Sequence, residues 1–349
     1  MRAMILAAGY GTRLWPLTVD RTKPAIPFLG RPLVGYVAEY LARNGVSEVV
    51  VNLHHRPESV REALGDGSRF GVQLEYVEEP EILGTSGAMD NARHLLDSDT
   101  FIVVNGKIVT DINLQAALET HRRRNALATL VLRNNFKRER FTVVQTKDGL
   151  ITEFGGMPAP RKAGNQLQHK EDAIREEASP ARPDGFEEEG APLMFTGIQI
   201  LEPRIFDYIP RGRFSHSVTD VYLPAIKRGE RIAAHVAAGM WHELSTIPRY
   251  LEISLALLKE QGRDVEIGDG CQLDDKASVR ESILWDNVRV EAGAHVRRAV
   301  LGDGVRVGSG ERIEEAAVVR AELVLGLEPP PKALRGEVRG ENFVVPLPQ

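Results

Sequence analysis

The sequence contains a single cysteine, Cys271, among 349 residues. An intrachain disulfide is therefore excluded, which is typical of a cytoplasmic protein. No apolar run approaches the roughly 20 residues that span a bilayer, and the first residues lack the pattern of a signal peptide. The sequence has no large excess of either charge, because 44 Lys and Arg against 49 Asp and Glu leave a net charge of −5. We therefore expect a cytoplasmic protein with neither a membrane nor a nucleic acid as partner.

What the sequence does contain indicates a globular chain with more than one domain. Hydrophobic residues make up 42% and charged residues 27% of the total, as in folded globular proteins. A length of 349 residues exceeds one average domain and predicts two. We expect the domains to be residues 1–262 and residues 263–349, because the spacing of apolar residues changes there.

Short apolar runs alternate with helix-like patterns in the first part of the chain. The expected strands are Met4–Leu6, Glu48–Val51, Val72–Val77, Phe101–Val104 and Leu127–Leu132. The expected helices are Pro32–Arg43, Pro57–Leu64, Ser86–Leu96 and Leu114–Arg123. This alternation predicts an α/β fold, a mostly parallel sheet with helices on both faces. Ligands bind such sheets at the carboxyl ends of the strands, where the loops after Leu6 and Val104 emerge.

Residues 155–192 have a different composition. They are rich in Pro, Gly, Ala, Lys and Glu and contain few large apolar residues. This composition predicts a mobile insertion. A strand pattern resumes at Met194–Leu201, and a long helical pattern covers Pro248–Gln261.

The last part of the chain repeats with a period of 17 residues. Mostly aliphatic residues form the columns Leu273/Val290/Val307, Val279/Val296/Ile313, Ile283/Val300/Ala317 and Cys271/Val288/Val305. Turn pairs beginning at Asp269, Asp286 and Asp303 keep the same period. Apolar residues that also recur every six positions within a repeat are typical of a left-handed hexapeptide β-helix, one triangular coil per repeat. We expect this domain to mediate homo-oligomerisation, with a regulatory or second catalytic site as the alternative.

The segment from Met4 to Lys23, MILAAGYGTRLWPLTVDRTK, carries the strongest signal for function. An apolar strand leads into a loop of small residues, Ala7–Thr12, and the cations Arg13 and Lys23 follow. Small residues let backbone N–H groups approach phosphate oxygens closely. A guanidinium and an ammonium then neutralise the phosphate charge. The segment therefore predicts a phosphate-binding loop, although its spacing fits neither a Walker loop nor a dinucleotide-binding glycine motif.

The sequence LAAGYGTRLWPLT, followed by TKPAIPFLGRPLVGY, resembles the signature of the sugar-1-phosphate nucleotidyltransferases, the NDP-sugar pyrophosphorylases. It is most similar to the mannose-1-phosphate guanylyltransferase branch. The resemblance implies a Rossmann-like nucleotidyltransferase sheet followed by the β-helix. It also implies that a nucleoside triphosphate and a sugar 1-phosphate react with release of pyrophosphate. GDP-mannose chemistry, with GTP as substrate, is our first expectation, and thymidylyl or uridylyl transfer to a hexose 1-phosphate is the alternative.

The resemblance also implies roles for particular residues. Arg13 would stabilise the departing pyrophosphate, and Lys23 would reach the α-phosphate and the sugar phosphate. The implied nucleotide-binding residues are Ala7, Ala8, Gly9, Gly11, Thr12, Arg13, Gly84 and Asn105. Gly84 belongs to Leu83–Ala88, LGTSGA, a motif at the start of a helix. Thr196 and Gly197 match the family's sugar-binding strand, although a plain core strand is the alternative there.

Three positions depart from the family pattern. Lys107 stands where the family keeps a metal-binding Asp, and Glu243 stands where it keeps the second one. Met157 stands where a lysine for the sugar phosphate is expected. Asp111 is an alternative ligand four residues beyond Lys107, but the family pattern has an acidic residue there in any case, so we interpret Asp111 as structural. The Mg²⁺ that the resemblance implies is therefore in doubt here, and Glu243 is our candidate metal ligand.

These departures leave two hypotheses open. In the first, the chain is an enzyme in which Lys107 is catalytic and its ammonium supplies charge where Mg²⁺ would lie. In a variant of it, an ion is held by Glu243 and the triphosphate alone. In the second, Lys107 and Glu243 form an ion pair, and the chain is a regulatory subunit or sensor that binds a nucleotide sugar without turnover.

Overall fold

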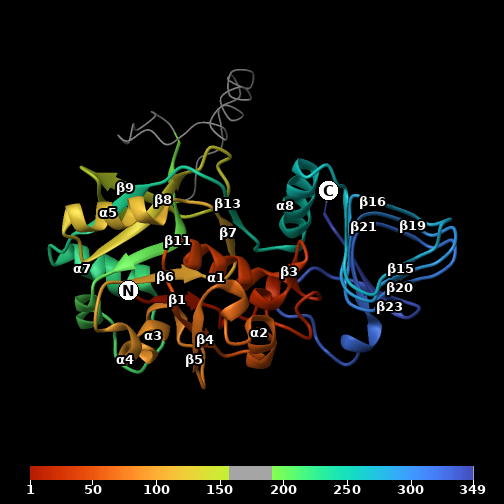
Figure 1. Cartoon of the computed structure of the whole chain (residues 1–349), viewed down its shortest axis with the longest axis horizontal. Helices are drawn as coiled ribbons and strands as arrows, with labels where there is room; N and C mark the ends of the chain where they lie inside the picture. Colours follow the sequence, from red (N-terminus) through yellow and green to blue (C-terminus); the bar gives the residue numbers. More distant parts are fainter. Residues whose placement is uncertain (157–190, 349) are drawn as a thin grey trace. The chain divides into compact units, whose positions relative to one another are not determined.

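The computed structural model describes residues 1–156 and 191–348 (Figure 1). The predicted insertion at residues 155–192 therefore lies almost entirely outside the described residues, as does Met157. The chain divides into two compact units. The sheet unit comprises Met1–Leu6, Val37–His54 and Asp66–Trp241, and the β-helix unit comprises Ala7–Tyr36, His55–Gly65 and His242–Gln349.

The sheet unit is built on one nine-stranded sheet with the order β5-β4-β1-β6-β11-β8-β12-β10-β9. Its strands are β1 (Ala3–Leu6), β4 (Glu48–Leu53), β5 (Gln73–Glu78), β6 (Phe101–Asn105), β8 (Ala128–Asn134), β9 (Val143–Lys147), β10 (Leu150–Phe154), β11 (Leu193–Leu201) and β12 (Ile232–Val236). Strands β5, β4, β1 and β6 pair in parallel, as do β8 and β12. Strand β11 runs antiparallel between β6 and β8, and β10 pairs antiparallel with β12 and β9. The predicted α/β sheet is confirmed, but it is mixed rather than mostly parallel, because β11 enters it in the reverse direction.

Helices cover both faces of this sheet, as predicted. On one face, Met89 of α3 (Gly84–Asn91) and Leu96 of α4 (Arg93–Leu96) share a buried core with Leu130 of β8. On the other face, His121 of α5 (Leu114–Arg124) lies with its Nδ1 2.9 Å from Thr129 Oγ1. Adjacent residues of a strand point to opposite faces, so α5 lies across the sheet from α3 and α4 (Figure 1).

Further elements of the two units range from strands of two residues to one helix of 14 residues. They are β2 (Pro27–Phe28), β3 (Arg31–Pro32), β7 (Ile108–Thr110), β13 (Trp241–Glu243), α1 (Leu33–Arg43), α2 (Pro57–Leu64), α7 (Leu223–Lys227), α8 (Ile247–Glu260), η1 (Thr12–Leu14), η2 (Lys23–Ala25), η3 (Ser68–Phe70), η4 (Pro203–Asp207), η5 (Ser217–Tyr222) and η6 (Ala321–Leu323). No helix in the described ranges is both long enough and apolar enough to cross a membrane.

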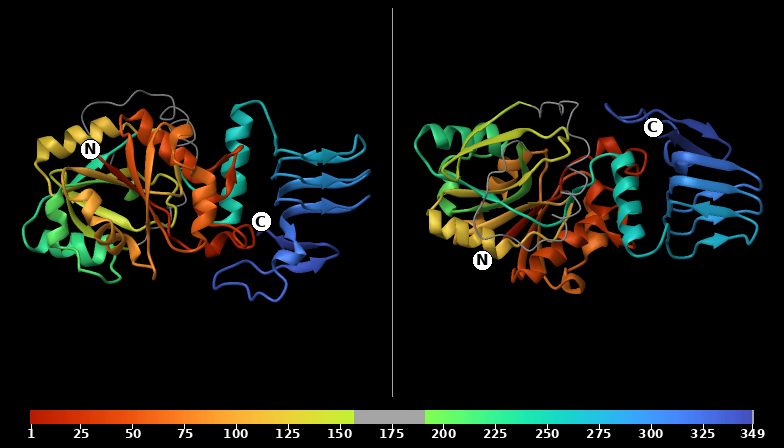
Figure 2. Two further views of the ribbon diagram at one scale, coloured as in Figure 1. Left: turned by 60° about the horizontal axis from the view of Figure 1, so that its bottom comes forward. Right: turned by 90° about the horizontal axis from the view of Figure 1, so that it is seen from above.

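The β-helix has the period that the sequence predicts. Every parallel pairing joins residues 17 apart, such as Ser278 with His295 and His295 with Arg312. Its strands are β14 (Val265–Ile267), β15 (Gln272–Leu273), β16 (Ser278–Arg280), β17 (Ser282–Leu284), β18 (Arg289–Val290), β19 (His295–Leu301), β20 (Arg306–Val307) and β21 (Arg312–Arg320). Figure 2 shows these strands stacked in successive coils. The predicted columns supply its core, where Val290, Val296 and Val307 are each at most 2% exposed.

One end of the β-helix is covered by a feature that the repeat does not predict. Strand β23 (Asn342–Pro346) pairs antiparallel with β21, and β22 (Glu337–Arg339) pairs with β23. An antiparallel strand ends the stack of coils, because it cannot continue the parallel register. Such capping protects the last coil of a repeat array.

Candidate active site

The loop after β1 brings Gly11 and Lys23 together within the β-helix unit. Gly11 has φ +67° and directly precedes η1. Its carbonyl accepts a hydrogen bond of 2.8 Å from Leu14 N. A Cβ added at Gly11 would lie 3.0 Å from Lys23 Cβ and 3.3 Å from Lys23 N. Gly11 is therefore required both for the left-handed backbone and for the close approach of Lys23. The structure brings these two predicted site residues together.

The same loop has an exposed part. Gly9 and Arg13 are exposed, whereas Ala7 and Ala8 are 1% and 6% exposed. A Cβ added at Gly9 would meet no atom within 4 Å. The backbone at Gly9 is therefore open to a ligand, while Ala7 and Ala8 are core residues whose small size lets the loop pack. Thr12 is the first residue of η1 and is partly buried.

Lys23 begins the short helix η2, and its neighbours are fixed. Thr22 is fully buried, and its backbone N–H donates to Ser59 Oγ at 3.1 Å. Ile26 N donates to the carbonyl of Lys23 at 3.2 Å. The backbone that carries the Lys23 ammonium is thereby held in a defined place.

In the sheet unit, the carboxyl ends of β1 and β6 lie side by side. Leu6 is the register partner of Asn105, and Gly106 N donates to Leu6 O at 3.0 Å. A Cβ at Gly106 would lie 2.9 Å from that same carbonyl oxygen. Our sequence reasoning missed Gly106, although a glycine directly after a strand was a usable signal. This edge is where the sequence predicted the ligand.

Gly197 and Asn105 also lie together at this edge. Gly197 has φ +83°, and a Cβ there would lie 2.2 Å from Asn105 Nδ2. The register of β11 against β8 shifts between Phe195 and Gln199, which marks a bulge around Gly197. Bulges often lie beside active sites, where they redirect a side chain. The predicted nucleotide residue Asn105 and the predicted sugar residue Gly197 therefore share one part of the sheet edge.

Thr196, in the same bulge, is hydrogen-bonded to other residues of the sheet unit. Its hydroxyl is buried and donates to Val131 O at 2.7 Å, so the side chain is directed into the sheet. Its carbonyl accepts a hydrogen bond of 2.9 Å from the indole of Trp241. The ring of Phe141 lies edge-on to Trp241 at 5.6 Å. A direct sugar contact by the Thr196 hydroxyl remains a prediction, whereas Trp241 and Phe141 are aromatic groups of this edge that our site prediction omitted.

The motif Leu83–Ala88 packs against a neighbouring segment. Gly84 has φ +74°, and a Cβ there would lie 2.6 Å from Ser215 O. The amides of Ser86 and Gly87 donate to that same carbonyl at 3.1 and 3.4 Å. The contact with Ser215 accounts for a glycine at position 84, and nucleotide binding by Gly84 remains a prediction.

A buried carboxylate, Glu79, organises the start of this motif. Its Oε1 accepts from Asn52 Nδ2 at 2.5 Å, and its Oε2 accepts from Leu83 N at 2.8 Å. Burial raises the pKa of Glu79 above its ordinary value, and these hydrogen bonds lower it by less. No periodic pattern in the sequence indicates that Glu79 is buried, so its role was missed.

The two positions that the resemblance implies for a metal hold Lys107 and Glu243. Asp111 accepts a hydrogen bond of 2.6 Å from Met240 N, which supports the expectation that it is structural. Lys107, in the sheet unit, is a cation, and Glu243 is 8% exposed in the β-helix unit. Within residues 1–156 and 191–348, no three His, Cys, Asp or Glu side chains are grouped as a metal site would require. Mg²⁺ is commonly held by only one or two carboxylates together with substrate phosphates, so Glu243 as a ligand remains a prediction.

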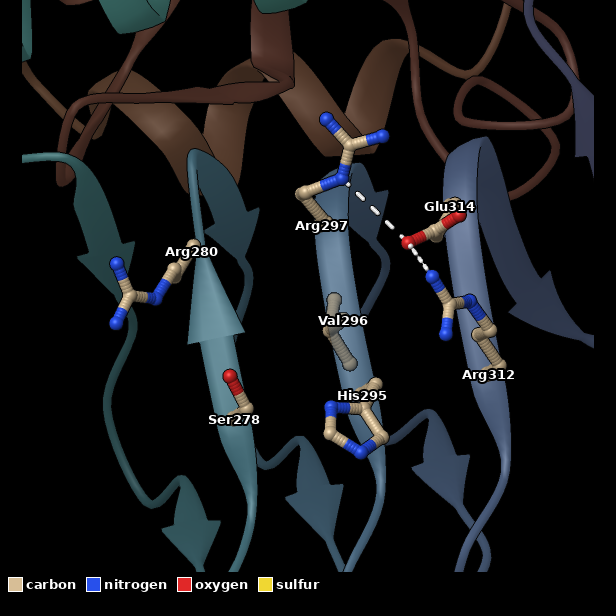
Figure 3. A pocket seen from close by; sticks show the side chains of 7 residues that line it. All are labelled: Ser278, Arg280, His295, Val296, Arg297, Arg312 and Glu314. Atoms are coloured by element: carbon tan, nitrogen blue, oxygen red, sulfur yellow. Dashed lines mark hydrogen bonds and ion pairs between the residues drawn. The ribbon is translucent and has the colours of Figure 1, made fainter.

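A shallow cavity of about 240 Å³ lies on the β-helix face formed by β16, β19 and β21 (Figure 3). Arg312 Nη2 and Arg297 Nε lie 2.8 and 3.5 Å from Glu314 Oε1 (Figure 3). Arg280 and His295 also line it. None of the predicted site residues lies in this cavity.

Comparison with known proteins agrees with both parts of this geometry. The family profile described as "Nucleotidyl transferase" matches residues 2–260, and the profile "GlmU-like, C-terminal hexapeptide" matches residues 259–329. The chain is 29% identical over 300 residues to a UTP–glucose-1-phosphate uridylyltransferase of Synechocystis, covering 82% of this chain and 71% of that protein. It is 27% identical over 260 residues to a mannose-1-phosphate guanylyltransferase of Mycobacterium tuberculosis, covering 74% and 64%.

A solved structure shows the same fold. A putative glucose-1-phosphate thymidylyltransferase of Bacillus anthracis, solved in complex with a sucrose, matches with a TM-score of 0.58 and 22% identity. The match covers 74% of this chain and 94% of that chain. The matched profile spans most of the sequence, and the relatives are sugar-1-phosphate nucleotidyltransferases. The chain therefore belongs to the nucleotidyl transferase family of enzymes, with a GlmU-like hexapeptide domain at its C-terminal end.

Proposed function

We propose that this chain transfers a nucleotidyl group from a nucleoside triphosphate to a sugar 1-phosphate. A phosphate oxygen of the sugar attacks the α-phosphorus. The bond from that phosphorus to the oxygen bridging to the β-phosphate breaks, and pyrophosphate leaves with the bond's electron pair. The nucleophile is already an anion, so the protein must mainly align two anions and offset their charge.

The observation that carries this proposal is the packing of Lys23 against Gly11. It fixes a lysine backbone beside a glycine loop whose exposed part holds Gly9 and Arg13. Arg13 is suited to the β- and γ-phosphates, because its guanidinium forms paired hydrogen bonds with phosphate oxygens. Lys23 is suited to the α-phosphate as a compact charge.

Lys107 is the third cation of the proposal. It follows Gly106, whose amide is bonded to the end of β1. Because a lysine stands where the resemblance implies a metal-binding Asp, we assign to the Lys107 ammonium part of the positive charge that the α-phosphate requires. A single charge stabilises the transition state less than a divalent ion, so turnover should be slow by the standard of the family.

GTP and mannose 1-phosphate are the substrate pair that we propose first. The guanylyltransferase among the relatives supports this pair. The uridylyltransferase among them makes UTP with glucose 1-phosphate the competing pair.

A pyrophosphate-release assay tests these proposals. The four common NTPs would be combined with mannose 1-phosphate and glucose 1-phosphate, with Mg²⁺ and with EDTA. We expect release with at least one pair, and release that persists in EDTA if Lys107 supplies the charge. Abolition by EDTA would contradict the role of Lys107 but not the transfer reaction.

The alternative function is a nucleotide-sugar sensor, which the lysine at position 107 favours. In that case the wild type binds nucleotide without releasing pyrophosphate, and Lys107→Asp restores release in Mg²⁺. Lys107→Asn is the matched control, because it removes the same cation without adding an anionic ligand. Turnover by the wild type in EDTA would eliminate the sensor.

We also propose that the chain forms a homo-oligomer through its β-helix and that it is cytoplasmic. The proposed oligomer predicts a mass above 38.6 kDa in light scattering. Charge-reversing substitutions on exposed β-helix residues such as Arg289 should lower that mass.

A further inference from the structure

Arg21 attaches the N-terminal loop to the β-helix. It lies two positions before Lys23, in the same compact unit as residues 242–349. Its Nη2 forms an ion pair with Asp303, and its Nε donates to Asp20 Oδ1 at 3.0 Å. Its guanidinium carbon lies over the ring of Trp285, 5.2 Å from the centroid. A β-helix aromatic ring and a β-helix carboxylate therefore hold this arginine together.

The carboxylate of Asp303 is itself fixed by the coil. Its Oδ1 accepts from Asp286 N at 3.1 Å, and Asp286 Oδ1 accepts from Asp269 N at 2.8 Å. These aspartates are the first residues of the turns that recur every 17 residues. Asp303 is thus a rigid partner, which reduces the entropy lost when it pairs with Arg21.

The same tryptophan also holds the other side of Lys23. The indole Nε1 of Trp285 donates to the hydroxyl of Tyr250 at 3.1 Å, and this hydroxyl donates to Pro27 O at 2.6 Å. Trp285 is 3% exposed and Tyr250 is fully buried. A hydrogen-bonded chain without access to water fixes its end groups more firmly than an exposed one.

Lys23 therefore lies between two attachment points. The segment Arg21–Pro27, which we call the Lys23 segment, contacts Trp285 directly at its first residue and through Tyr250 at its last. We propose that the β-helix is a positioning device for the active site, in which Trp285, Asp303 and Tyr250 hold the Lys23 segment so that its ammonium meets the triphosphate. Arg21 is a positioning residue in this scheme, and the scheme rests on the proposed role of Lys23.

The proposal gives the β-helix a function within one chain, separate from oligomerisation. A phosphate-binding lysine loses little conformational entropy on binding when its backbone is already fixed. Releasing Arg21 would leave Lys23 chemically intact but displaced. A substitution of Arg21 should therefore weaken NTP binding in the same way as a substitution of Lys23.

Nucleotide affinity in single and double variants tests this. The variants are Arg21→Gln, Asp303→Asn, Lys23→Ala and Arg21→Gln combined with Lys23→Ala, with affinity measured by calorimetry. We expect Arg21→Gln and Asp303→Asn to weaken NTP binding about tenfold, a change typical of a lost positioning contact. In the Lys23→Ala background, Arg21→Gln should add less than about twofold, because coupled residues are not additive. Arg21→Lys should restore part of the loss, since it keeps the charge but not the planar fork.

Arg339→Gln is the matched control. Arg339 is an exposed β-helix arginine paired with Glu337, so its loss removes a similar ion pair away from the Lys23 segment. It should leave NTP affinity unchanged. Equal loss in Arg339→Gln, or full additivity of Arg21→Gln with Lys23→Ala, would overturn the proposal.

Hydrogen exchange separates this proposal from the proposed function. In ligand-free protein, Asp303→Asn should speed exchange of the amides of Ala25 and Ile26, which bond to Thr22 and Lys23 carbonyls, while β-helix amides keep their protection. Faster exchange with no NTP binding by the wild type would retain the attachment but refute the catalytic role of Lys23. Unchanged exchange would refute the attachment whatever the activity.

Discussion

The two glycine-rich segments of this chain look alike in sequence but have different surroundings. In Ala7–Thr12, Gly9 has no atom within 4 Å of an added Cβ, and the nearest atoms to a Cβ at Gly11 belong to Lys23 and Thr18, at 3.0 to 3.3 Å. In Leu83–Ala88, Gly84 and Gly87 face the backbone of residues 213–215 at under 3 Å. The first segment keeps its backbone open at Gly9, while both glycines of the second, Gly84 and Gly87, pack against the backbone of another segment.

Their backbone amides differ in the same way. Ser86 N and Gly87 N at the start of α3 both donate to Ser215 O. Ser215 N in turn donates to Leu83 O at 3.0 Å. A helix start whose amides are already bonded cannot offer them to a phosphate. Matching a glycine motif therefore identifies a close approach but does not identify the approaching group, which for Gly84 and Gly87 is the protein backbone.

The largest expected effect comes from removing the two cations that follow the first segment, Lys23 and Arg13. Lys23→Ala should lower kcat/KM by about 10²-fold or more, as for loss of one group that stabilises transition-state charge. Arg13→Ala should weaken NTP binding by about tenfold, because it removes a bidentate phosphate partner. Steady-state kinetics and calorimetry measure these effects.

Arg213→Ala is the control for this comparison. Arg213 is an exposed arginine beside the second glycine segment. It should leave both measurements unchanged. If Arg213→Ala weakened NTP binding as much as Arg13→Ala, the contrast between the two segments would be wrong.

The next effect distinguishes the segments by stability. Gly84→Ala places a Cβ 2.6 Å from Ser215 O and forces a side chain onto φ +74°, which should destabilise the fold by about 3 kcal/mol. Gly9→Ala meets no atom and should change stability by less than about 0.5 kcal/mol. Gly9→Ala should instead weaken NTP binding, because its methyl group would occupy ligand space. Urea unfolding measures the stability of both variants, and calorimetry measures their NTP affinity. A destabilised Gly9→Ala variant with normal NTP affinity would show that Gly9 serves packing and not ligand binding.

Much of the fold followed from local patterns. The strands at Met4 and Phe101 and the helix at Leu114 were predicted within two residues of their observed bounds. The 17-residue register of the β-helix was fully contained in the repeat, because each coil pairs only with its neighbours. The reverse direction of β11 was not predictable from periodicity, since an apolar run carries no information about which strands flank it. The cap by β23 was missed for the same reason.

Site residues were predictable where the local backbone conformation allows only one type of residue. Gly11 is such a residue, because its positive φ and the nearby Lys23 backbone both exclude a side chain. The role of Arg21 was not predictable, since Asp303 lies 282 positions away in the sequence. Glu79 was missed because its partner Asn52, 27 positions away in the sequence, becomes a neighbour only when β4 and β5 pair. Nothing local distinguishes a buried glutamate from an exposed one.

The smallest expected effect is the pH dependence that Glu79 gives to the second segment. Burial raises the pKa of Glu79 above 4.5, so the folded chain holds this proton more tightly than the unfolded chain does. Its contribution to stability is therefore fully present below about pH 4.5 and is lost as pH rises through the folded pKa. In urea unfolding from about pH 4 to pH 7, the wild type should lose stability relative to Glu79→Gln. Glu75→Gln, which changes an exposed glutamate of β5, should show no such trend. A difference between the wild type and Glu79→Gln that does not vary with pH would show that the second segment depends on the hydrogen bonds of Glu79 and not on its proton.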